Sequence, residues 1–303
     1  MKIGFVFPGQ GSQYIDMGKD FYEKYIEARQ VYDKAEKKLK TDIKKLCFEE
    51  EGQLNNMQLA IYITEMAILE VVKTKNIKAE YVAGLSLGEY AAITYAEMID
   101  LDKGISLVEK RATYMKEEIE PGEYKMMAVM GLEDEKVIDI CEKIPGFIVP
   151  VNFNCPGQVV VSGDSDIVEK SLEIFKENGA KRVIPLNVKS AFHTSKLEKA
   201  KEKLYEELKN VTINEGKYEV YKNIDGAKYI KTDDVRKILS NHIVSPVYFS
   251  KSIKNMIEEG VDTFIEIGPG KTLSGFIKKV SKDVKVININ KVEDLEKLEE
   301  IIC

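Results

Sequence analysis

The sequence has 303 residues, of which 32% are charged and 44% hydrophobic, as is typical of a soluble globular protein. Its formal net charge of -6 at pH 7 argues against a general nucleic-acid binder, because such proteins need a positive field to displace counterions from phosphates. No stretch approaches the length of a membrane span, and the first apolar run ends at Pro8, too early for a signal peptide. We therefore expect a cytoplasmic protein that binds neither nucleic acid nor a membrane.

The first 120 residues predict alternating strands and helices. The expected strands are residues 3–7 and 81–83, and a glycine-rich loop at residues 8–13 follows the first of them. The expected helices are residues 21–40, 56–73, 89–98 and 101–118.

The next 65 or so residues form a pattern of their own. The expected strands are residues 126–130, 147–153, 158–162 and 181–186, and the expected helices are residues 133–143 and 167–178. This βαββαβ order is the ferredoxin-like arrangement. We infer a small subdomain at residues 123–188, inserted into a core made of residues 1–122 and 189–303.

The remainder of the chain returns to alternating elements. Helices are expected at residues 195–209, 233–242 and 250–259, strands at 263–267 and 284–289, and a short surface helix in the acidic tail. Alternation of this kind implies an α/β fold, with a mostly parallel sheet covered on both faces.

The most informative motif is Gly84-Leu85-Ser86-Leu87-Gly88, which directly follows an apolar strand. This is the pattern of a nucleophile elbow, in which a serine is held on a sharp strand-to-helix turn that requires flanking glycines. Short matches to this pattern also arise by chance, so a plain turn is the alternative.

A serine nucleophile needs a base and an oxyanion hole. The chain has two histidines, and His193 is the better candidate for the base, because it lies in the loop where the inserted subdomain returns to the core. A structural histidine is the alternative. The oxyanion hole would use the backbone NH of Leu87 and a second NH from the loop containing Gln10, although that loop is also interpretable as a plain glycine-rich turn.

Arg111 lies on the edge of an apolar helical stripe. None of its neighbours three or four residues away is acidic, so its charge must be balanced by a distant carboxylate or by a ligand anion. Both alternatives are open from these residues. A guanidinium is well suited to bind a carboxylate with two parallel hydrogen bonds.

Neither a metal site nor a nucleotide site is predicted. The four cysteines are widely scattered, without zinc-type spacing or a disulfide framework, which indicates free thiols. Gly270-Lys271-Thr272 resembles the end of a Walker A loop, but Ile265 stands where the first glycine of that motif is required. The segment is better interpreted as a tight strand-to-helix turn beside the elbow.

Four segments, taken together and in order, resemble the malonyl-CoA:acyl carrier protein transacylase family of fatty acid synthesis and the related acyltransferase domains of polyketide synthases. They are residues 7–13, residues 86–90, residues 151–154 with 156–160, and residues 266–271. The resemblance covers nearly the whole chain. It implies an α/β-hydrolase-like core with a mostly parallel sheet and an inserted ferredoxin-like subdomain.

The resemblance also implies roles for the site residues. Ser86 is expected to be the acylated nucleophile and His193 its base, with the NH groups of Gln10 and Leu87 as the oxyanion hole. Arg111 is expected to bind the malonyl carboxylate. In the sequence Ala191-Phe192-His193, Phe192 resembles the residue that accompanies malonyl rather than methylmalonyl selection in polyketide acyltransferases.

The implied reaction is transfer of malonyl from malonyl-CoA to the phosphopantetheine thiol of acyl carrier protein through a malonyl-serine. The coenzyme A thioester is the substrate, and no metal or other cofactor is expected. Two rival functions are considered. One is hydrolysis by an esterase, which uses the same serine and histidine. The other is non-catalytic docking of a carrier protein, which would explain the loop motifs but not the presence of Ser86, His193 and Arg111 together. A free-standing chain of this length favours fatty acid over polyketide synthesis.

Two positions depart from the family pattern. Leu85 stands where the family commonly has a histidine before the nucleophile, and we expect altered packing rather than lost activity. His242 stands where the family usually has a glutamine or asparagine whose backbone carbonyl orients the catalytic imidazole, a role that survives a change of side chain.

A lysine-rich stretch beside His193 is a candidate docking surface for the acidic carrier protein. Its members are Lys189, Lys196, Lys199, Lys201 and Lys203. A solvated helix face is the alternative.

Overall fold

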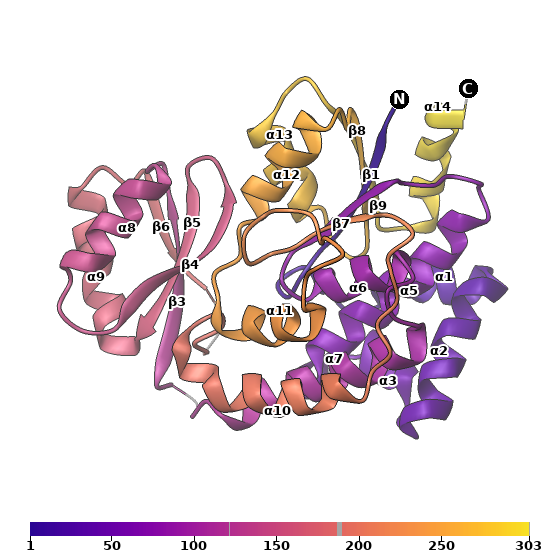
Figure 1. Ribbon diagram of the computed structural model, residues 1–303, viewed down its shortest axis with the longest axis horizontal. Helices are drawn as coiled ribbons and strands as arrows, with labels where there is room; N and C mark the ends of the chain where they lie inside the picture. The colour runs from indigo at the N-terminus through magenta and orange to yellow at the C-terminus, as the bar shows by residue number, and fades with distance from the viewer. Residues whose placement is uncertain (121, 187–189, 303) are drawn as a thin grey trace.

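The computed structural model describes residues 1–120, 122–186 and 190–302. Its strands form a five-stranded sheet in the order β7-β2-β1-β8-β9 and a four-stranded sheet in the order β4-β5-β3-β6. The strands are β1 (Ile3–Phe7), β2 (Tyr81–Gly84), β3 (Tyr124–Met130), β4 (Ile148–Cys155), β5 (Gln158–Asp164), β6 (Arg182–Pro185), β7 (Glu219–Tyr221), β8 (Thr263–Ile267) and β9 (Lys285–Ile289). Figure 1 shows the two sheets in separate units, the smaller on the left.

Helices surround both sheets. The α-helices are α1 (Lys19–Lys24), α2 (Ile26–Leu39), α3 (Ile43–Phe48), α4 (Glu50–Asn55), α5 (Met57–Lys73), α6 (Gly88–Tyr95), α7 (Leu101–Glu117), α8 (Asp134–Lys143), α9 (Ser165–Glu177), α10 (Glu198–Lys209), α11 (Val235–Asn241), α12 (Phe249–Glu258), α13 (Thr272–Val280) and α14 (Glu299–Ile302). Short 3-10 helices are η1 (Ser195–Leu197), η2 (His242–Val244) and η3 (Val292–Leu298).

The five-stranded sheet is parallel at every paired register, with β1 at its centre. Successive side chains of a strand point to opposite faces, and β1 follows this rule. Phe5 and Phe7 join the core formed with α2, α5, α6 and α7. Val6 joins the core formed with α12 and α13 on the opposite face. Because both faces are covered, the carboxyl ends of the strands are where functional loops gather.

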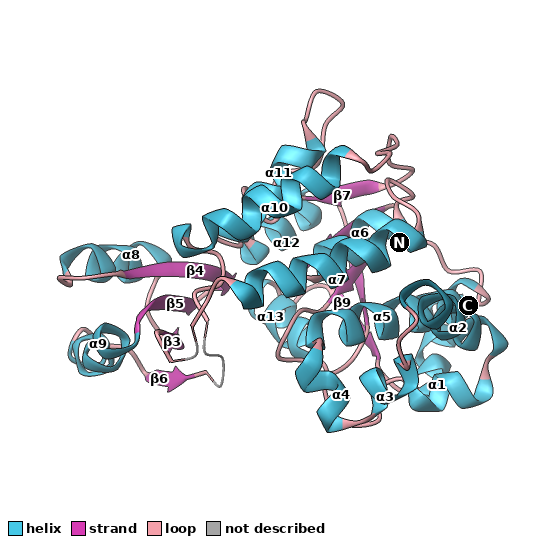
Figure 2. Ribbon diagram, turned by 90° about the horizontal axis from the view of Figure 1, so that it is seen from below, coloured by secondary structure: helices cyan, strands magenta, loops and turns pink. Residues whose placement is uncertain are grey.

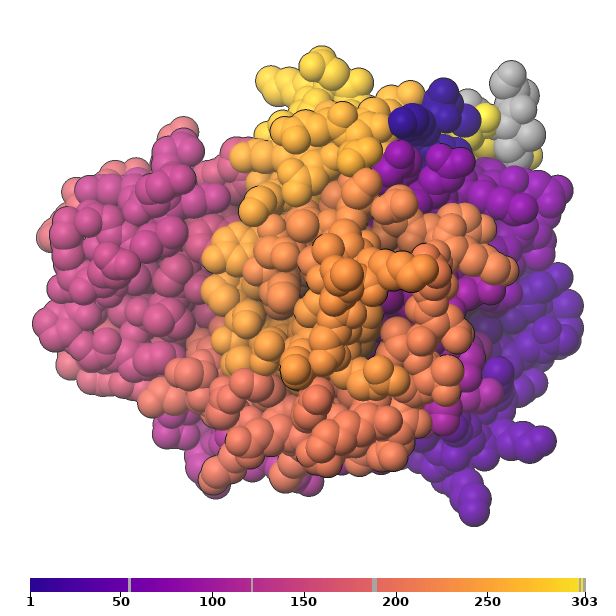
Figure 3. Space-filling model, in the orientation of Figure 1, coloured from indigo at the N-terminus to yellow at the C-terminus, as the bar shows by residue number. Residues whose placement is uncertain are grey.

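The four-stranded sheet is antiparallel and built from residues 124–185, with α8 and α9 packed against one face. Figure 2 shows these helices on the outer side of the sheet, and Figure 3 shows the unit as a magenta and pink lobe. The opposite face carries Met126, Ala128 and Val160, which turn toward the larger unit. The strand order and the βαββαβ sequence of elements confirm the predicted fold class.

A backbone connection joins the two units. Phe153 N donates to Val247 O at 2.8 Å, and Val247 N donates to Val151 O at 2.9 Å. The rings of Phe153 and Tyr248 stack beside this connection with centroids 4.9 Å apart. The segment that follows His242 is therefore fixed to the small sheet.

Several local predictions differ from the structure. The helix predicted over residues 21–40 is broken at Tyr25, which has an extended backbone. Because of this break, the apolar faces of α1 and α2 both pack into the same core. The sequence pattern also gave no sign of α3, α4 or β7, which are too short for periodicity to identify. The tail is less exposed than predicted, since Leu295 and Leu298 are buried.

In the described ranges, no helix combines the length and apolarity needed to cross a bilayer.

Candidate active site

The predicted elbow is a sharp turn between β2 and α6. Ser86 has a φ of 53°, in the left-handed region that non-glycine residues rarely adopt. A Cβ atom on Gly84 would lie 1.9 Å from the backbone carbon of Gly88, and a Cβ on Gly88 would lie 2.1 Å from the carbonyl oxygen of Phe7. Only glycine fits at both positions, so the two glycines allow the turn that projects Ser86.

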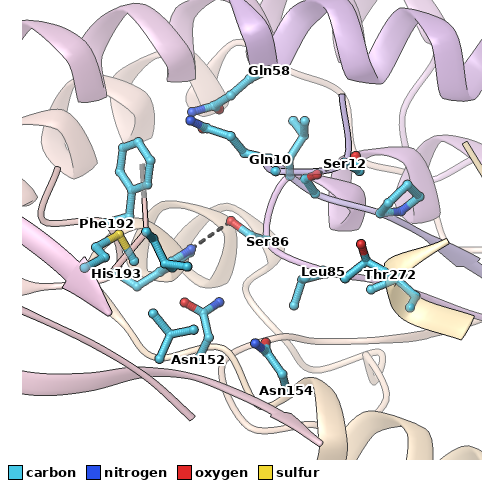
Figure 4. Close-up of a pocket in the computed structure, with 18 of the residues that line it drawn as sticks. Gln10, Ser12, Gln58, Leu85, Ser86, Asn152, Asn154, Phe192, His193 and Thr272 are labelled. Carbon is cyan, nitrogen blue, oxygen red and sulfur yellow. Dashed lines mark hydrogen bonds between the residues drawn. The ribbon is translucent and has the colours of Figure 1, made fainter. Parts of the chain in front are cut away.

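The structure brings Ser86 and His193 into direct contact. Ser86 Oγ lies 2.7 Å from His193 Nε2, as the dashed line in Figure 4 shows. His193 Nδ1 lies 2.9 Å from the carbonyl oxygen of His242, which can only accept a hydrogen bond. Nδ1 therefore carries the proton, and Nε2 presents its lone pair to the serine hydroxyl. This is the arrangement that general-base activation of a serine requires.

The loop that carries His193 is held in an unusual conformation. His193 has a φ of 62°, and Thr194 Oγ1 donates to the carbonyl of Ala191 at 2.8 Å. A left-handed non-glycine residue costs free energy and persists only when its surroundings fix it. Both members of the proposed dyad thus sit on strained backbone.

Burial sets the protonation state of the imidazole. His193 is 4% exposed, and burial followed by the nearby charge of Arg111 lowers its pKa from 6.5 to about 4. The imidazole is therefore neutral at neutral pH and available as a base.

The two residues whose amides are predicted to form the oxyanion hole line the same cavity. Leu87 stands at the amino end of α6, and Gln10 lies in the loop after β1; both line the cavity that contains Ser86. Within the described part of the chain, neither amide has a hydrogen-bond partner. The amino end of a helix favours negative charge, which suits a developing oxyanion.

Arg111, on α7, is 1% exposed and points toward the serine. Its Nη1 donates to Gln58 Oε1, and its Nη2 donates to Ser86 Oγ at 3.2 Å. No carboxylate of residues 1–120, 122–186 or 190–302 forms an ion pair with it, and its Nε has no partner there. Burial lowers the pKa of this guanidinium. A buried cation without a structural counterion favours the ligand-anion interpretation.

The cavity has a volume of about 540 Å³ and lies between the two units. Phe192 and Leu85 line it, together with Met126 and Val160 from the small sheet. Figure 4 shows Phe192 beside His193 and Leu85 on the other side of Ser86. An acyl group bound to the serine would therefore contact apolar side chains along much of its length.

Two members of the lysine-rich stretch form ion pairs within the chain. Lys201 lies 2.5 Å from Glu198 and Lys203 lies 2.8 Å from Glu117, whereas Lys196 lies 4.6 Å from the ring centroid of Phe147. Lys189 falls outside the described residues. Internal pairing reduces the positive charge that this face offers to an acidic partner.

Three of the four cysteines lie within the described residues. Cys47, Cys141 and Cys155 are buried free thiols, and Cys303 lies outside the described residues. Among the residues described, no three His, Cys, Asp or Glu side chains form a group that would bind a metal ion.

Sequence reasoning missed three polar side chains around the serine. Gln58 is buried and contacts Arg111, Asn223 contacts the elbow backbone, and Glu89 is fully buried behind it. Gln58 left one signal, as a polar residue in the first turn of a largely apolar helix. Asn223 left none, because it follows the short strand β7 that periodicity does not detect.

Comparison with known proteins gives consistent matches over nearly the whole chain. The acyl transferase domain family matches residues 4–297. The chain is 40% identical to the malonyl CoA-acyl carrier protein transacylase of Bacillus subtilis (strain 168), an alignment that covers 97% of this chain and 95% of that protein.

Solved structures resemble this fold closely. The malonyl CoA-acyl carrier protein transacylase of Clostridium perfringens superimposes with a TM-score of 0.96 at 41% identity, covering 100% of this chain and 97% of the other. A malonyl-transacylase in complex with a type II PKS acyl-carrier protein superimposes with a TM-score of 0.94 at 31% identity, covering 99% of this chain and 100% of the other.

Proposed function

This chain belongs to the acyl transferase domain family, and from that membership we propose that it transfers malonyl from malonyl-CoA to the phosphopantetheine thiol of acyl carrier protein. The observation that carries the proposal is one cavity in which Ser86 Oγ contacts both His193 Nε2 and the guanidinium of Arg111. A nucleophile, a base and a buried cation in contact are what transfer of an acidic acyl group needs.

The first half-reaction forms a malonyl-serine. His193 Nε2 takes the hydroxyl proton while Ser86 Oγ attacks the thioester carbonyl, and the amides of Gln10 and Leu87 stabilise the resulting oxyanion. The C–S bond then breaks, the imidazolium returns its proton to the leaving sulfur, and coenzyme A departs as the thiol.

The second half-reaction reverses these steps with a different thiol. The carrier protein's phosphopantetheine thiol gives its proton to His193 and attacks the ester carbonyl of malonyl-Ser86. The C–O bond breaks, and the imidazolium protonates Ser86 Oγ. Because coenzyme A leaves before the acceptor thiol binds, the kinetics are ping-pong.

Arg111 selects the acyl group in this mechanism. Gln58 Oε1 accepts from Nη1 of the guanidinium. Arg111 Nη2, which contacts Ser86 Oγ, is next to the position that an esterified malonyl group would occupy. A carboxylate at that position would replace the missing counterion, so malonyl is preferred to acetyl.

The steps require no redox cofactor, because moving an acyl group between thiols and an alcohol is redox-neutral. They require no metal, because His193 moves the proton and the amides of Gln10 and Leu87 stabilise the oxyanion. The coenzyme A thioester acts as substrate. The named activity of the relatives fits fatty acid synthesis. We propose that the reaction serves this synthesis and takes place in the cytoplasm.

Incubation with malonyl-CoA, with and without holo acyl carrier protein, tests the proposal. We expect mass spectrometry to find one malonyl adduct on Ser86, stable until carrier protein is added, and none in Ser86→Ala. Steady release of coenzyme A without carrier protein would instead indicate hydrolysis. Binding of carrier protein without any adduct would indicate a docking module.

A further inference from the structure

Asn223 lies directly behind the proposed nucleophile. It follows β7 at the edge of the parallel sheet, next to the turn after β2, and it is 2% exposed. All four of its polar groups, the backbone N and O and the side-chain Oδ1 and Nδ2, have hydrogen-bond partners.

Its side chain bonds to the backbone on both sides of Leu85. Asn223 Oδ1 accepts from Ser86 N at 2.7 Å, and Asn223 Nδ2 donates to Gly84 O at 2.7 Å. Only one orientation of the amide satisfies both, since Ser86 N is a donor and Gly84 O an acceptor. The Asn223 side chain thus accepts a hydrogen bond from the backbone NH of Ser86, the residue whose backbone is strained.

The backbone of Asn223 connects this turn to the rest of the site. Asn223 N donates to Glu89 Oε2 at 3.1 Å, and Asn223 O accepts from Tyr248 N at 2.8 Å. Tyr248 lies in the segment after His242, whose carbonyl accepts from His193. One buried residue therefore links the turn that carries the nucleophile to the segment that orients the base.

Glu89 completes the network from α6. Its Oε1 accepts from Tyr229 Oη at 2.6 Å, and its Oε2 lies 3.3 Å from His242 Nδ1. The two groups do not align as a hydrogen bond, since His242 Nδ1 has no such partner among the described residues. Burial lowers the pKa of His242 well below 6.5, so this contact is made by a neutral imidazole rather than an ion pair.

We infer that Asn223 is a positioning residue for Ser86: its side-chain amide fixes the strained turn so that the hydroxyl lies at His193 Nε2. The inference rests on the proposed function only in taking Ser86 as the nucleophile. A carboxamide suits the role because it offers one acceptor and one donor side by side, and a displacement of about 1 Å at a reacting atom costs roughly 10²-fold in rate.

The first test compares Asn223→Ala with Asn255→Ala. Asn255 is the matched control because its amide also donates to a backbone carbonyl, that of Gly226 at 2.8 Å, but does not contact the elbow. We expect Asn223→Ala to lower kcat for malonyl transfer roughly 10²-fold with KM changed less than about threefold. Asn255→Ala should keep kcat within about threefold of wild type.

A second readout does not depend on malonyl-CoA. A fluorophosphonate reacts with an activated serine, so its labelling rate at Ser86 should fall in Asn223→Ala by a similar factor. If wild type is labelled but transfers no malonyl, the proposed function fails while this comparison still tests Asn223. Wild-type labelling in a folded Asn223→Ala would overturn the inference.

Asn223→Asp provides a test by rescue. A protonated carboxyl group can accept from Ser86 N and donate to Gly84 O, whereas a carboxylate lacks the donor. The carboxyl group introduced at position 223 would titrate beside Glu89, Tyr229 and His242. We expect labelling of this variant to be slow at pH 8 and to recover toward pH 5.5, whereas the wild-type labelling rate should stay constant over that range.

Two results would refute the positioning role. One is an Asn223→Asp variant whose labelling rate follows the wild-type pH dependence. The other is loss of folding, measured by circular dichroism, in both Asn223 variants while Asn255→Ala stays folded, which would assign Asn223 a structural role only.

Discussion

Arg111 Nη2 lies 3.2 Å from Ser86 Oγ, so the buried cation and the proposed nucleophile are in direct contact. The serine hydroxyl accepts from the guanidinium while its own hydrogen faces His193 Nε2, 2.7 Å away. Such a contact favours the alkoxide character that develops during attack. It also places the cation within reach of an acyl group attached to that oxygen.

Replacement of Arg111 by alanine should reverse the acyl preference. Loss of a buried cation paired with a substrate carboxylate costs about 3 to 4 kcal/mol, so malonyl transfer should fall roughly 10²- to 10³-fold. Acetyl transfer, which makes no such pair, should fall far less. Competition between malonyl-CoA and acetyl-CoA measures the ratio, and an unchanged malonyl preference would contradict the assignment.

Gln58→Ala should weaken malonyl binding without removing the cation. The amide of Gln58 accepts from Arg111 Nη1, and an unpaired buried donor costs about 1 to 3 kcal/mol. We expect KM for malonyl-CoA to rise roughly tenfold to a hundredfold, because the guanidinium loses its fixed orientation. Steady-state kinetics measure this, and a change confined to kcat with KM unaltered would be evidence against it.

The base should remain active at unusually low pH. Burial lowers the pKa of His193 to about 4, so Ser86 labelling by a fluorophosphonate should stay constant from pH 8 to about 5 and fall near pH 4. Arg111→Met should move this limb toward 6.5, because the guanidinium is the second cause of the low pKa. An acidic limb near 6.5 in wild type would show that the imidazole is not buried as described.

The lowered pKa of His193 also makes the stability of the folded protein depend on pH. Between pH 6.5 and about 4 the unfolded chain binds a proton at His193 that the folded chain does not, so this residue makes the protein less stable as the pH falls through that range. Denaturant titrations of wild type and His193→Gln should therefore differ in their pH dependence between these values. Parallel curves would exclude this contribution.

His242→Gln should leave the reaction nearly unchanged. The imidazole of His193 is oriented by the backbone carbonyl of residue 242, which the substitution keeps. We expect kcat within about threefold of wild type, as for a conservative change outside the reacting atoms. A loss above tenfold would mean that the side chain, and not the carbonyl alone, orients the base.

Phe192→Ala should broaden the acyl selectivity. The Phe192 ring lines the cavity beside His193, and its removal makes room for a methyl group on the acyl α-carbon. One methyl group in such a pocket is worth about 1 to 3 kcal/mol, so discrimination against methylmalonyl-CoA should fall roughly tenfold or more. Retained discrimination would place the selecting contact elsewhere.

The sequence alone predicted those features that depend on neighbouring residues. Strand and helix periodicity gave the α/β class and the ferredoxin-like insert, because side-chain spacing within a segment reports which face is buried. The Gly-Leu-Ser-Leu-Gly turn was identifiable for the same reason, since the glycines that permit it lie within two residues of Ser86.

Only the tertiary structure decided which distant groups serve Ser86. Asn223 bonds to it across 137 residues, and the Gln58 contact with Arg111 spans 53. Such hydrogen bonds depend on the order of strands in the sheet and on how helices pack over it, and no local pattern encodes either. The balance of charge at Arg111 was open for the same reason, because its burial, without a carboxylate partner among the described residues, is a property of the assembled core.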